Sequence, residues 1–210
     1  NASANCTFEV FKAVPTIAIT ANNVTYGNNV TVTANIGTYF NGKKLEFIIS
    51  DGATVVKSEN ATVDSTGNAG ITYDNGDPGN YSVVVKFDGD INYNSTIGTD
   101  NFEISKASIN PADINVTVTD PIYGQVVVEV DLPNNVTGNV TLNVKDQGKT
   151  FDANISNSKA IFQLGNQITV GNHNITVTYN GNKYYTEASK NDTITVTKMT
   201  TSIVLENVTV

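Results

Sequence analysis

The sequence of 210 residues lacks several residue types on which common functions depend. Its 12 basic side chains are all lysines, and 20 acidic side chains bring the formal net charge to −8. An acidic chain without Arg is a poor nucleic-acid binder, because phosphate neutralisation and guanine readout rely on clustered Lys and Arg. The one Cys cannot form an internal disulfide, and the one His cannot form a histidine cluster for a transition metal. No apolar run approaches the ~20 residues that span a bilayer, so we expect no membrane insertion by this segment.

The chain is instead rich in Asn and Thr, with 30 and 28 residues, and it repeats itself. Segment 79–90 matches 171–182, which lies 92 residues later, and Tyr26-Gly27 matches Tyr123-Gly124, which lies 97 residues later. Internal similarity at such a period is typical of tandem domains. We therefore expect two full copies, 13–106 and 107–198.

Both ends of the chain are similar to parts of the repeat. Phe8-Glu9-Val10-Phe11-Lys12-Ala13 matches 102–107, and 201–205 is similar to 15–19. Residues 1–12 are thus either the terminal strand of a preceding repeat or a donor strand for another molecule. Residues 199–210 are either the first strand of a following repeat or a donor strand.

Within each copy, apolar and polar residues alternate, as Val30 and Val32 do with Thr31 and Thr33. This period of two places apolar groups on one face of a strand, and turns rich in Gly and Asn separate the runs. We expect an all-β chain of two tandem Ig-like antiparallel β-sandwiches, arranged end to end because the linkers are short, with an orphan strand at each terminus. The expected strands span 16–20, 29–36, 44–49, 53–58, 69–73, 80–88 and 101–106, then 114–119, 126–132, 140–145, 149–155, 159–164, 173–179 and 192–197.

Three stretches, 24–32, 78–93 and 102–106, together resemble the bacterial-type immunoglobulin-like tandem repeats of microbial surface proteins. The Asn- and Thr-rich composition looks most like the repeats of adhesin-like proteins from methanogenic archaea. This resemblance implies modules that form stalks or adhesive surfaces and carry no catalytic residues. The chain departs from antibody-type domains because it lacks their Cys pair and core Trp.

Fourteen Asn-x-Ser/Thr sequons, none with Pro in the middle, are acceptors for N-glycosylation. Because residues i and i+2 share a strand face, an Asn- and Thr-rich outer face also produces this pattern without glycans. We expect glycans first at five sites in or beside predicted turns, namely Asn23, Asn60, Asn94, Asn135 and Asn191. The other acceptors are Asn1, Asn5, Asn29, Asn80, Asn115, Asn139, Asn154, Asn174 and Asn207.

Asp88, Asp90 and Asn92 have the i, i+2, i+4 oxygen spacing of Ca²⁺-binding loops, which makes them a weak calcium candidate. The second copy has Asn180 and Asn182 at the first two of these positions and no carboxylate, so we favour a hairpin turn. No other metal and no cofactor is expected.

Four further features have structural or functional interpretations. His173 takes the place of Tyr81 in the second copy. A Tyr at such a sandwich corner commonly forms a hydrogen bond to the backbone, and we expect His173 to replace it as a side chain with a polar end. Cys6 is either a free thiol or a link to another chain. Tyr39-Phe40 and Tyr184-Tyr185 are either packing residues or ligand contacts. A Lys–Asn isopeptide crosslink needs an inward Lys, whereas the candidates flank turns or point outward: Lys43, Lys44, Lys57, Lys86, Lys145 and Lys149.

Together these patterns predict a non-enzymatic module of the extracellular cell surface, the stalk of a large adhesin-like protein that carries N-glycans. The alternative is a subunit of an extracellular surface filament assembled by β-strand donation between neighbours. The expected partners are neighbouring repeats or neighbouring subunits, and beyond them another cell or a surface glycan. Nucleic acid is not an expected partner.

Overall fold

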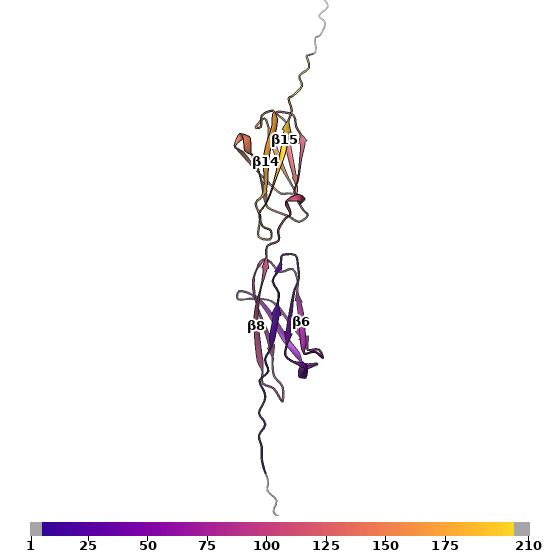
Figure 1. Ribbon diagram of the computed structural model, residues 1–210, viewed down its shortest axis with the longest axis vertical. Helices are drawn as coiled ribbons and strands as arrows, with labels where there is room; N and C mark the ends of the chain where they lie inside the picture. Colours follow the sequence, from indigo (N-terminus) through magenta and orange to yellow (C-terminus); the bar gives the residue numbers. More distant parts are fainter. Residues whose placement is uncertain (1–5, 204–210) are drawn as a thin grey trace, which may run out of the picture. The chain divides into compact units, whose positions relative to one another are not determined.

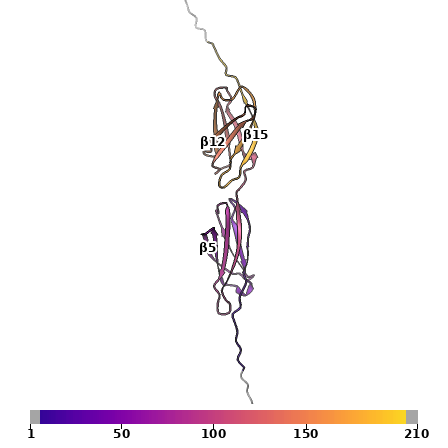
Figure 2. The ribbon, with the colours of Figure 1, turned by 90° about the vertical axis from the view of Figure 1, so that its left-hand side faces the viewer.

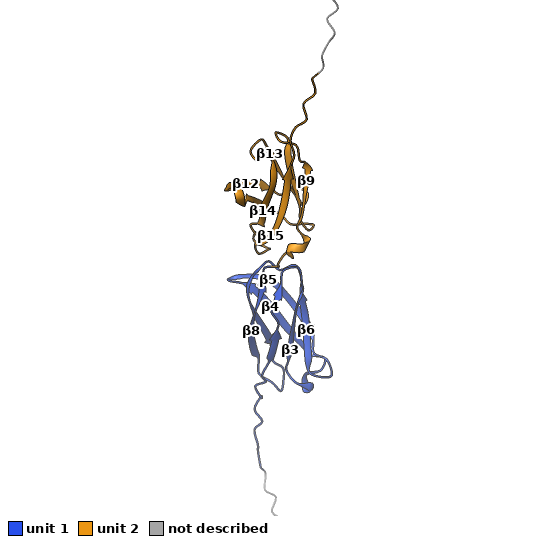
Figure 3. Ribbon diagram, turned by 45° about the horizontal axis from the view of Figure 1, so that its top comes forward, with its two compact units in different colours: residues 1–106 blue, residues 107–210 orange. Residues whose placement is uncertain are grey.

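The structure is a computed structural model that describes residues 6–203. The chain divides into two compact units, Asn1–Lys106 and Ala107–Val210 (Figure 3). The described residues form 15 β-strands and three 3₁₀-helices, and no α-helix occurs between residues 6 and 203. The expected all-β fold of tandem Ig-like sandwiches is confirmed.

Unit 1 packs a three-stranded sheet against a five-stranded sheet (Figure 1). The strand orders are β1-β3-β6 and β2-β8-β7-β4-β5. The strands are β1 Ala18–Ala21, β2 Val24–Thr25, β3 Val30–Asn35, β4 Lys44–Asp51, β5 Thr54–Thr62, β6 Asn68–Tyr73, β7 Gly79–Phe87 and β8 Thr96–Ser105, with the 3₁₀-helix η1 at Thr38–Phe40.

Unit 2 repeats this plan with sheets of three and four strands, in the orders β13-β10-β9 and β12-β11-β14-β15. Its strands are β9 Asn115–Asp120, β10 Val126–Asp131, β11 Asn139–Val144, β12 Lys149–Asn154, β13 Lys159–Gly165, β14 Gly171–Tyr179 and β15 Ala188–Val196. The 3₁₀-helices are η2 at Pro111–Asp113 and η3 at Lys145–Gln147. Asn110 caps η2, since its side chain accepts a hydrogen bond from the Ala112 amide.

The alternation of apolar and polar residues explains which side chains enter each core. On β3, Val30, Val32 and Ala34 are buried, whereas Thr31 and Thr33 are exposed. Each unit has its own hydrophobic cluster, made only of residues from that unit. Unit 1 adds an aromatic group, in which Tyr81 and Phe102 stack with their ring centroids 5.1 Å apart.

Fourteen of the 15 strands overlap the predicted ranges, and the strand that the sequence missed is β2. β2 has only two residues and pairs in parallel with β8, where Val24 lies opposite Ile104. Unit 2 has a comparable parallel bridge between Ile122 and Thr197. A pair this short leaves no periodic pattern in the sequence, so alternation cannot reveal it.

The fourth long strand of each unit joins the larger sheet: β5 pairs with β4, and β12 pairs with β11. Both strands therefore form edges of their sheets (Figure 2). In constant-type immunoglobulin domains the fourth strand belongs to the opposite sheet. Turn composition alone does not distinguish these arrangements, because the strand lies at an edge in either case.

The terminal segments do not pair within the described chain. Residues 6–12 form no strand, and Phe8, Val10 and Phe11 are largely exposed. Residues 198–203 likewise form no strand. The remainder of the two predicted terminal strands, 1–5 and 204–210, lies outside the described residues.

Candidate functional site

The acceptor asparagines are the most numerous candidate site residues, and the structure describes eleven of the fourteen. Ten of these eleven are exposed, and Asn139 is half-buried. Asn1, Asn5 and Asn207 lie outside the described residues.

Two of the five asparagines assigned to turns lie within strands instead. Asn60 belongs to β5, and Asn191 lies in the middle of β15. Asn23, Asn94 and Asn135 do lie in connections, and Asn135 adopts a left-handed φ of 66°. The expected placement was therefore wrong for Asn60 and Asn191, because β5 and β15 begin or continue through polar positions that interrupt the alternation.

Some of the sequon asparagines form hydrogen bonds within the fold. Asn23 Oδ1 accepts from the Glu103 amide at 2.8 Å, which ties the turn after β1 to β8. Asn94 Nδ2 donates to the Lys12 carbonyl at 3.4 Å. Asn191 Oδ1 accepts from Lys145 Nζ at 2.9 Å and from Thr176 Oγ1 at 2.8 Å. These three side chains have a structural role in addition to being acceptors.

Acceptor asparagines also lie on edge strands. Asn60, Asn115, Asn154 and Asn191 are in β5, β9, β12 and β15, each of which ends a sheet. Edge strands present unpaired backbone groups that other chains can pair with. On β5 this edge includes Val55 and Val56, with 57% and 39% of their surfaces exposed.

The outer face of the four-stranded sheet of unit 2 carries hydrogen-bonded polar side chains, mostly Asn and Thr. Thr141 Oγ1 donates to Asp152 Oδ1 at 2.6 Å, and Asn180 Nδ2 donates to Thr141 Oγ1 at 2.9 Å. Thr195 Oγ1 donates to Asn172 Oδ1 at 2.7 Å. Such cross-strand pairs stabilise a sheet, so the Asn and Thr pattern is explained in part without any ligand.

The calcium candidate forms a tight turn in which Asp90 is already engaged. Asp90 Oδ1 accepts from the amides of Asn92 and Tyr93, both at 2.9 Å. Lys43 Nζ lies 2.8 Å from Asp90 Oδ2, and the hydrogen bond from Lys43 holds the pKa of this carboxyl below its usual value. In unit 2, Asn182 Oδ1 accepts from the amides of Tyr184 and Tyr185 in the same way. The repeated element is therefore the turn, and it forms with a neutral amide in place of the carboxylate.

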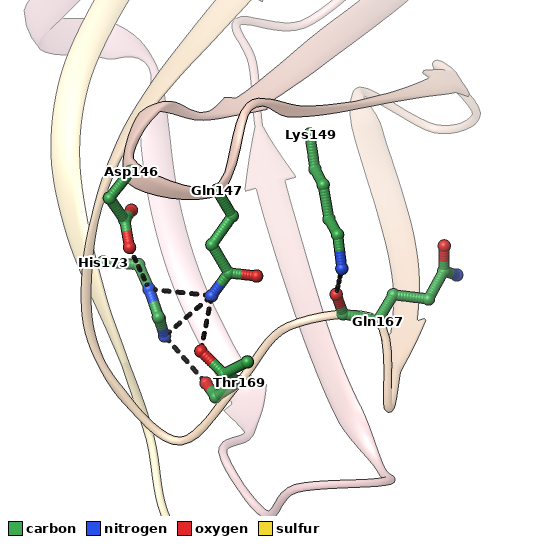
Figure 4. A network of polar contacts seen from close by, with 6 residues as sticks. All are labelled: Asp146, Gln147, Lys149, Gln167, Thr169 and His173. Carbon is green, nitrogen blue, oxygen red and sulfur yellow. Dashed lines mark hydrogen bonds and ion pairs between the residues drawn. The ribbon is translucent and has the colours of Figure 1, made fainter.

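Tyr81 and His173 occupy equivalent corners and make the same hydrogen bond. Tyr81 Oη donates to the carbonyl of Asp77 at 2.7 Å. His173 Nε2 lies 2.7 Å from the carbonyl of Thr169, which is again four residues upstream (Figure 4). Burial and the bond network around Tyr81 raise the pKa of its phenol.

His173 is 4% exposed and connects two loops of unit 2 (Figure 4). Its Nδ1 lies 2.7 Å from Asp146 Oδ2 and 3.2 Å from Gln147 Nε2. A protonated Nδ1 donates to Asp146, whereas an unprotonated Nδ1 accepts from Gln147. The contact with His173 lowers the pKa of Asp146. The partner of Nε2 is a backbone carbonyl and no hydroxyl, so the ring fits a structural role better than that of a base for a nucleophile.

The remaining candidates lie apart from one another. Cys6 is exposed. Phe40 packs against Phe87 and Tyr93, with centroid distances of 5.3 and 4.5 Å, while Tyr39 is 87% exposed. In unit 2, Tyr185 packs against the core and Lys183 Nζ lies 5.5 Å above the Tyr184 ring. Lys145 and Asn191 are within hydrogen-bond distance, but both are exposed, unlike the buried pair that a crosslink needs.

The surface hollows are open to solvent. One of about 620 Å³ in unit 1 lies beside β7 and β8 and is lined by Asn23, Gly52, Asn80, Tyr81, Ser82, Asn101, Phe102 and Glu103. Within the described part of the chain, no group of three or more His, Cys, Asp or Glu side chains is placed to hold a metal ion. The helices found between residues 6 and 203 are too short to cross a membrane.

No protein-family model and no curated protein sequence matches the chain. Among solved structures, a two-domain fibronectin type III segment of chicken tenascin is similar, with 12% identity, a TM-score of 0.50, and coverage of 87% of this chain and 99% of that chain. A tetra-tandem repeat from the extending region of a large adhesion protein has 14% identity and a TM-score of 0.41, over 85% of this chain and 50% of that chain. The chain has an Ig-like fold. At these identities the similarity concerns the fold alone.

Sequence reasoning identified the Tyr81 and His173 corner but missed Asp146 and Gln147. These two residues come from η3, and Asp146 is 27 positions from His173 in the sequence. A buried polar ring in a strand does signal that a partner must exist, because unpaired buried polar groups are costly. Which loop supplies that partner depends on the packing of the sandwich.

Proposed function

We propose that the chain is a non-enzymatic structural or adhesive module of the extracellular cell surface and that it carries N-linked glycans. The observation that carries this proposal is the surface of two self-contained sandwiches, where ten of the eleven described acceptor asparagines are exposed. The Ig-like fold, which is similar to that of a two-domain fibronectin type III segment of tenascin, supports a structural or adhesive module. The polar groups described above stabilise turns, corners and sheet faces, and none is paired with a nucleophile.

Glycans on edge strands would also have a physical purpose. Asn60 on β5 lies on the same exposed edge as Val55 and Val56, where a second chain could pair with the backbone. A glycan at Asn60 blocks that approach by its bulk. The same holds for Asn115, Asn154 and Asn191 at three other edges.

Mass spectrometry of protein from its native source tests the glycan part of the proposal. We expect the intact mass to fall when glycans are removed, and we expect glycopeptides that include Asn60. Thr62→Ala removes this sequon and should lower the mass by one glycan, whereas Thr62→Ser preserves the sequon and should not. An intact mass that does not change on deglycosylation would refute glycosylation.

Labelling of intact cells tests the location. A membrane-impermeant amine reagent should modify exposed lysines such as Lys44 and Lys183 before the cells are lysed. Labelling that occurs only after lysis would refute the extracellular assignment.

A filament assembled by strand donation is a second candidate, favoured by the exposure of Phe8 and Val10 at 87% and 81%. In that case the particle mass should rise with protein concentration, and Phe8→Asp should abolish the rise. A mass that stays at one chain over a wide concentration range would argue for the stalk.

A further inference from the structure

Phe8, Glu9, Val10 and Lys12 match the closing strand of a sandwich position by position. Phe8 and Val10 correspond to Phe102 and Ile104 of β8, 94 residues later, and to Ile194 and Val196 of β15. In the two complete units these four counterparts have exposed fractions of 2%, 1%, 1% and 2%. Phe8 and Val10 are 87% and 81% exposed. The same pattern is thus fully buried in two places and exposed in the third.

The polar positions of the segment agree with the same alignment. Glu9 corresponds to Glu103, which is exposed on β8, and Lys12 corresponds to Lys106. Phe11 departs from it, because its counterpart is Ser105, which is half-buried. Phe8 and Val10 are therefore the two residues whose counterparts are buried in a core while they themselves are exposed.

Ala13, which follows the segment, makes the same backbone hydrogen bonds as Ala107 at the start of unit 2. Ala13 donates its amide to the Asn92 carbonyl at 3.1 Å and accepts from the Asn94 amide at 2.9 Å. Ala107 donates to the Tyr184 carbonyl at 3.0 Å and accepts from the Thr186 amide at 2.9 Å. In the second case the residues immediately before Ala107 are the closing strand of a complete sandwich.

Within residues 6–203, the closing position of each unit is already occupied, so a second copy offers no open closing position there. In unit 1 the closing position beside β7 is filled by β8, and in unit 2 the position beside β14 is filled by β15. We propose that residues 6–12 form the closing strand of a further sandwich of the same repeat type, with Phe8 and Val10 inserted into its core. This inference rests on the structural-module part of the proposed function, and it is independent of glycosylation and of cellular location.

A chimera of the full chain tests the inference. Residues 13–99, which supply all of unit 1 except the second half of β8, are fused directly before Cys6, so that 6–12 follow in the register of 100–106. We expect the added copy to fold and the amides of residues 7–11 to exchange on the order of 1,000-fold more slowly than in the parent chain. Calorimetry should show a third unfolding transition.

Matched variants separate a specific strand from a general effect of fusion. Phe8→Asp should abolish the third transition of the chimera and leave both transitions of the parent unchanged, because Phe8 is exposed there. Phe11→Ser restores the residue found in β8 and should leave the chimera folded. A control chimera with residues 100–105 in place of 6–11 shows whether the fused copy can fold at all.

Two outcomes would overturn the inference. One is an added copy that stays unfolded while the control chimera folds. The other is self-association of the parent chain that Phe8→Asp removes, because this would place the segment in a second copy. Neither result depends on glycan mass or on surface labelling, so the proposed function can fail or stand separately.

Discussion

Leu142→Ala should destabilise unit 2 and leave unit 1 unchanged. Leu142 is fully buried on β11, between Phe151 of β12 and Val177 of β14. The substitution removes three carbon groups, each worth about 0.8 kcal/mol when buried, and leaves a cavity whose cost adds to that sum. We expect a loss of about 3 kcal/mol in the free energy of unfolding.

Differential scanning calorimetry of the full chain measures the effect. For a domain of this size 1 kcal/mol shifts the unfolding temperature by about 4–8 °C, so one transition should move down by roughly 12–24 °C. Leu45→Ala is the matched control, because Leu45 is a fully buried Leu on β4, the strand of unit 1 that corresponds to β11. It should move the other transition by a similar amount.

Each of the two cores is built from the residues of one unit, so the units should unfold separately. If either substitution shifted both transitions together, the units would unfold as one cooperative body. A shift below about 4 °C for Leu142→Ala would mean that the site collapses around the missing atoms, against the close packing of sandwich cores.

Three further predictions concern single side chains. The contact with His173 lowers the pKa of Asp146 from its ordinary value of 3.8. The parent should therefore have a higher unit-2 unfolding temperature than Asp146→Asn from pH 6 to about 4, and this difference should vanish as the pH falls further. A difference that persists at pH 2 would contradict this. Tyr81→Phe removes the bond to the Asp77 carbonyl and should cost unit 1 about 1 kcal/mol in urea unfolding, whereas an unchanged midpoint would show that water replaces the phenol. Gly67→Ala should lower the free energy of unfolding by about 2 kcal/mol more than Gly42→Ala does. Both glycines have a positive φ, but only at Gly67 would a Cβ lie 2.5 Å from the Gly37 backbone. Equal urea midpoints for the two variants would rule out that clash.

Most of the strands could be predicted from the sequence because a half-buried strand leaves a visible period of two. Val126, Val128 and Val130 alternate with half-buried neighbours on β10, and the predicted range 126–132 differs from the observed one by a single residue. Turn residues in left-handed conformations, such as Gly27 and Gly124, mark the boundaries. The pattern fails where a strand faces something other than the apolar core.

The closing strands show why. β8 begins at Thr96 and β15 at Ala188, four or five residues before the predicted starts at 101 and 192. On β8, Asp100 Oδ2 accepts from the Ala21 amide at 3.1 Å, and a Cβ at Gly98 would lie 2.9 Å from the Ile17 carbonyl. On β15, Lys190 Nζ donates to the Ile114 carbonyl at 2.6 Å. The first half of β8 therefore packs against the backbone of β1 and of Ile17 just before it, and the first half of β15 contacts the backbone just before β9. These contacts require polar or small residues.

The two halves of the closing strand differ in composition, and this explains why the N-terminal segment can be recognised from its sequence. Only the second half carries the buried apolar pair, Phe102 and Ile104 in β8 or Ile194 and Val196 in β15. Residues 6–12 correspond to that half, and so they have a recognisable apolar pattern although no partner strand lies beside them in the described chain. Since the first half contributes polar, small or exposed residues, Phe8 and Val10 must supply the apolar burial when the segment closes a sandwich. Substituting either residue by Asp should accordingly prevent closure, whatever residues precede the segment.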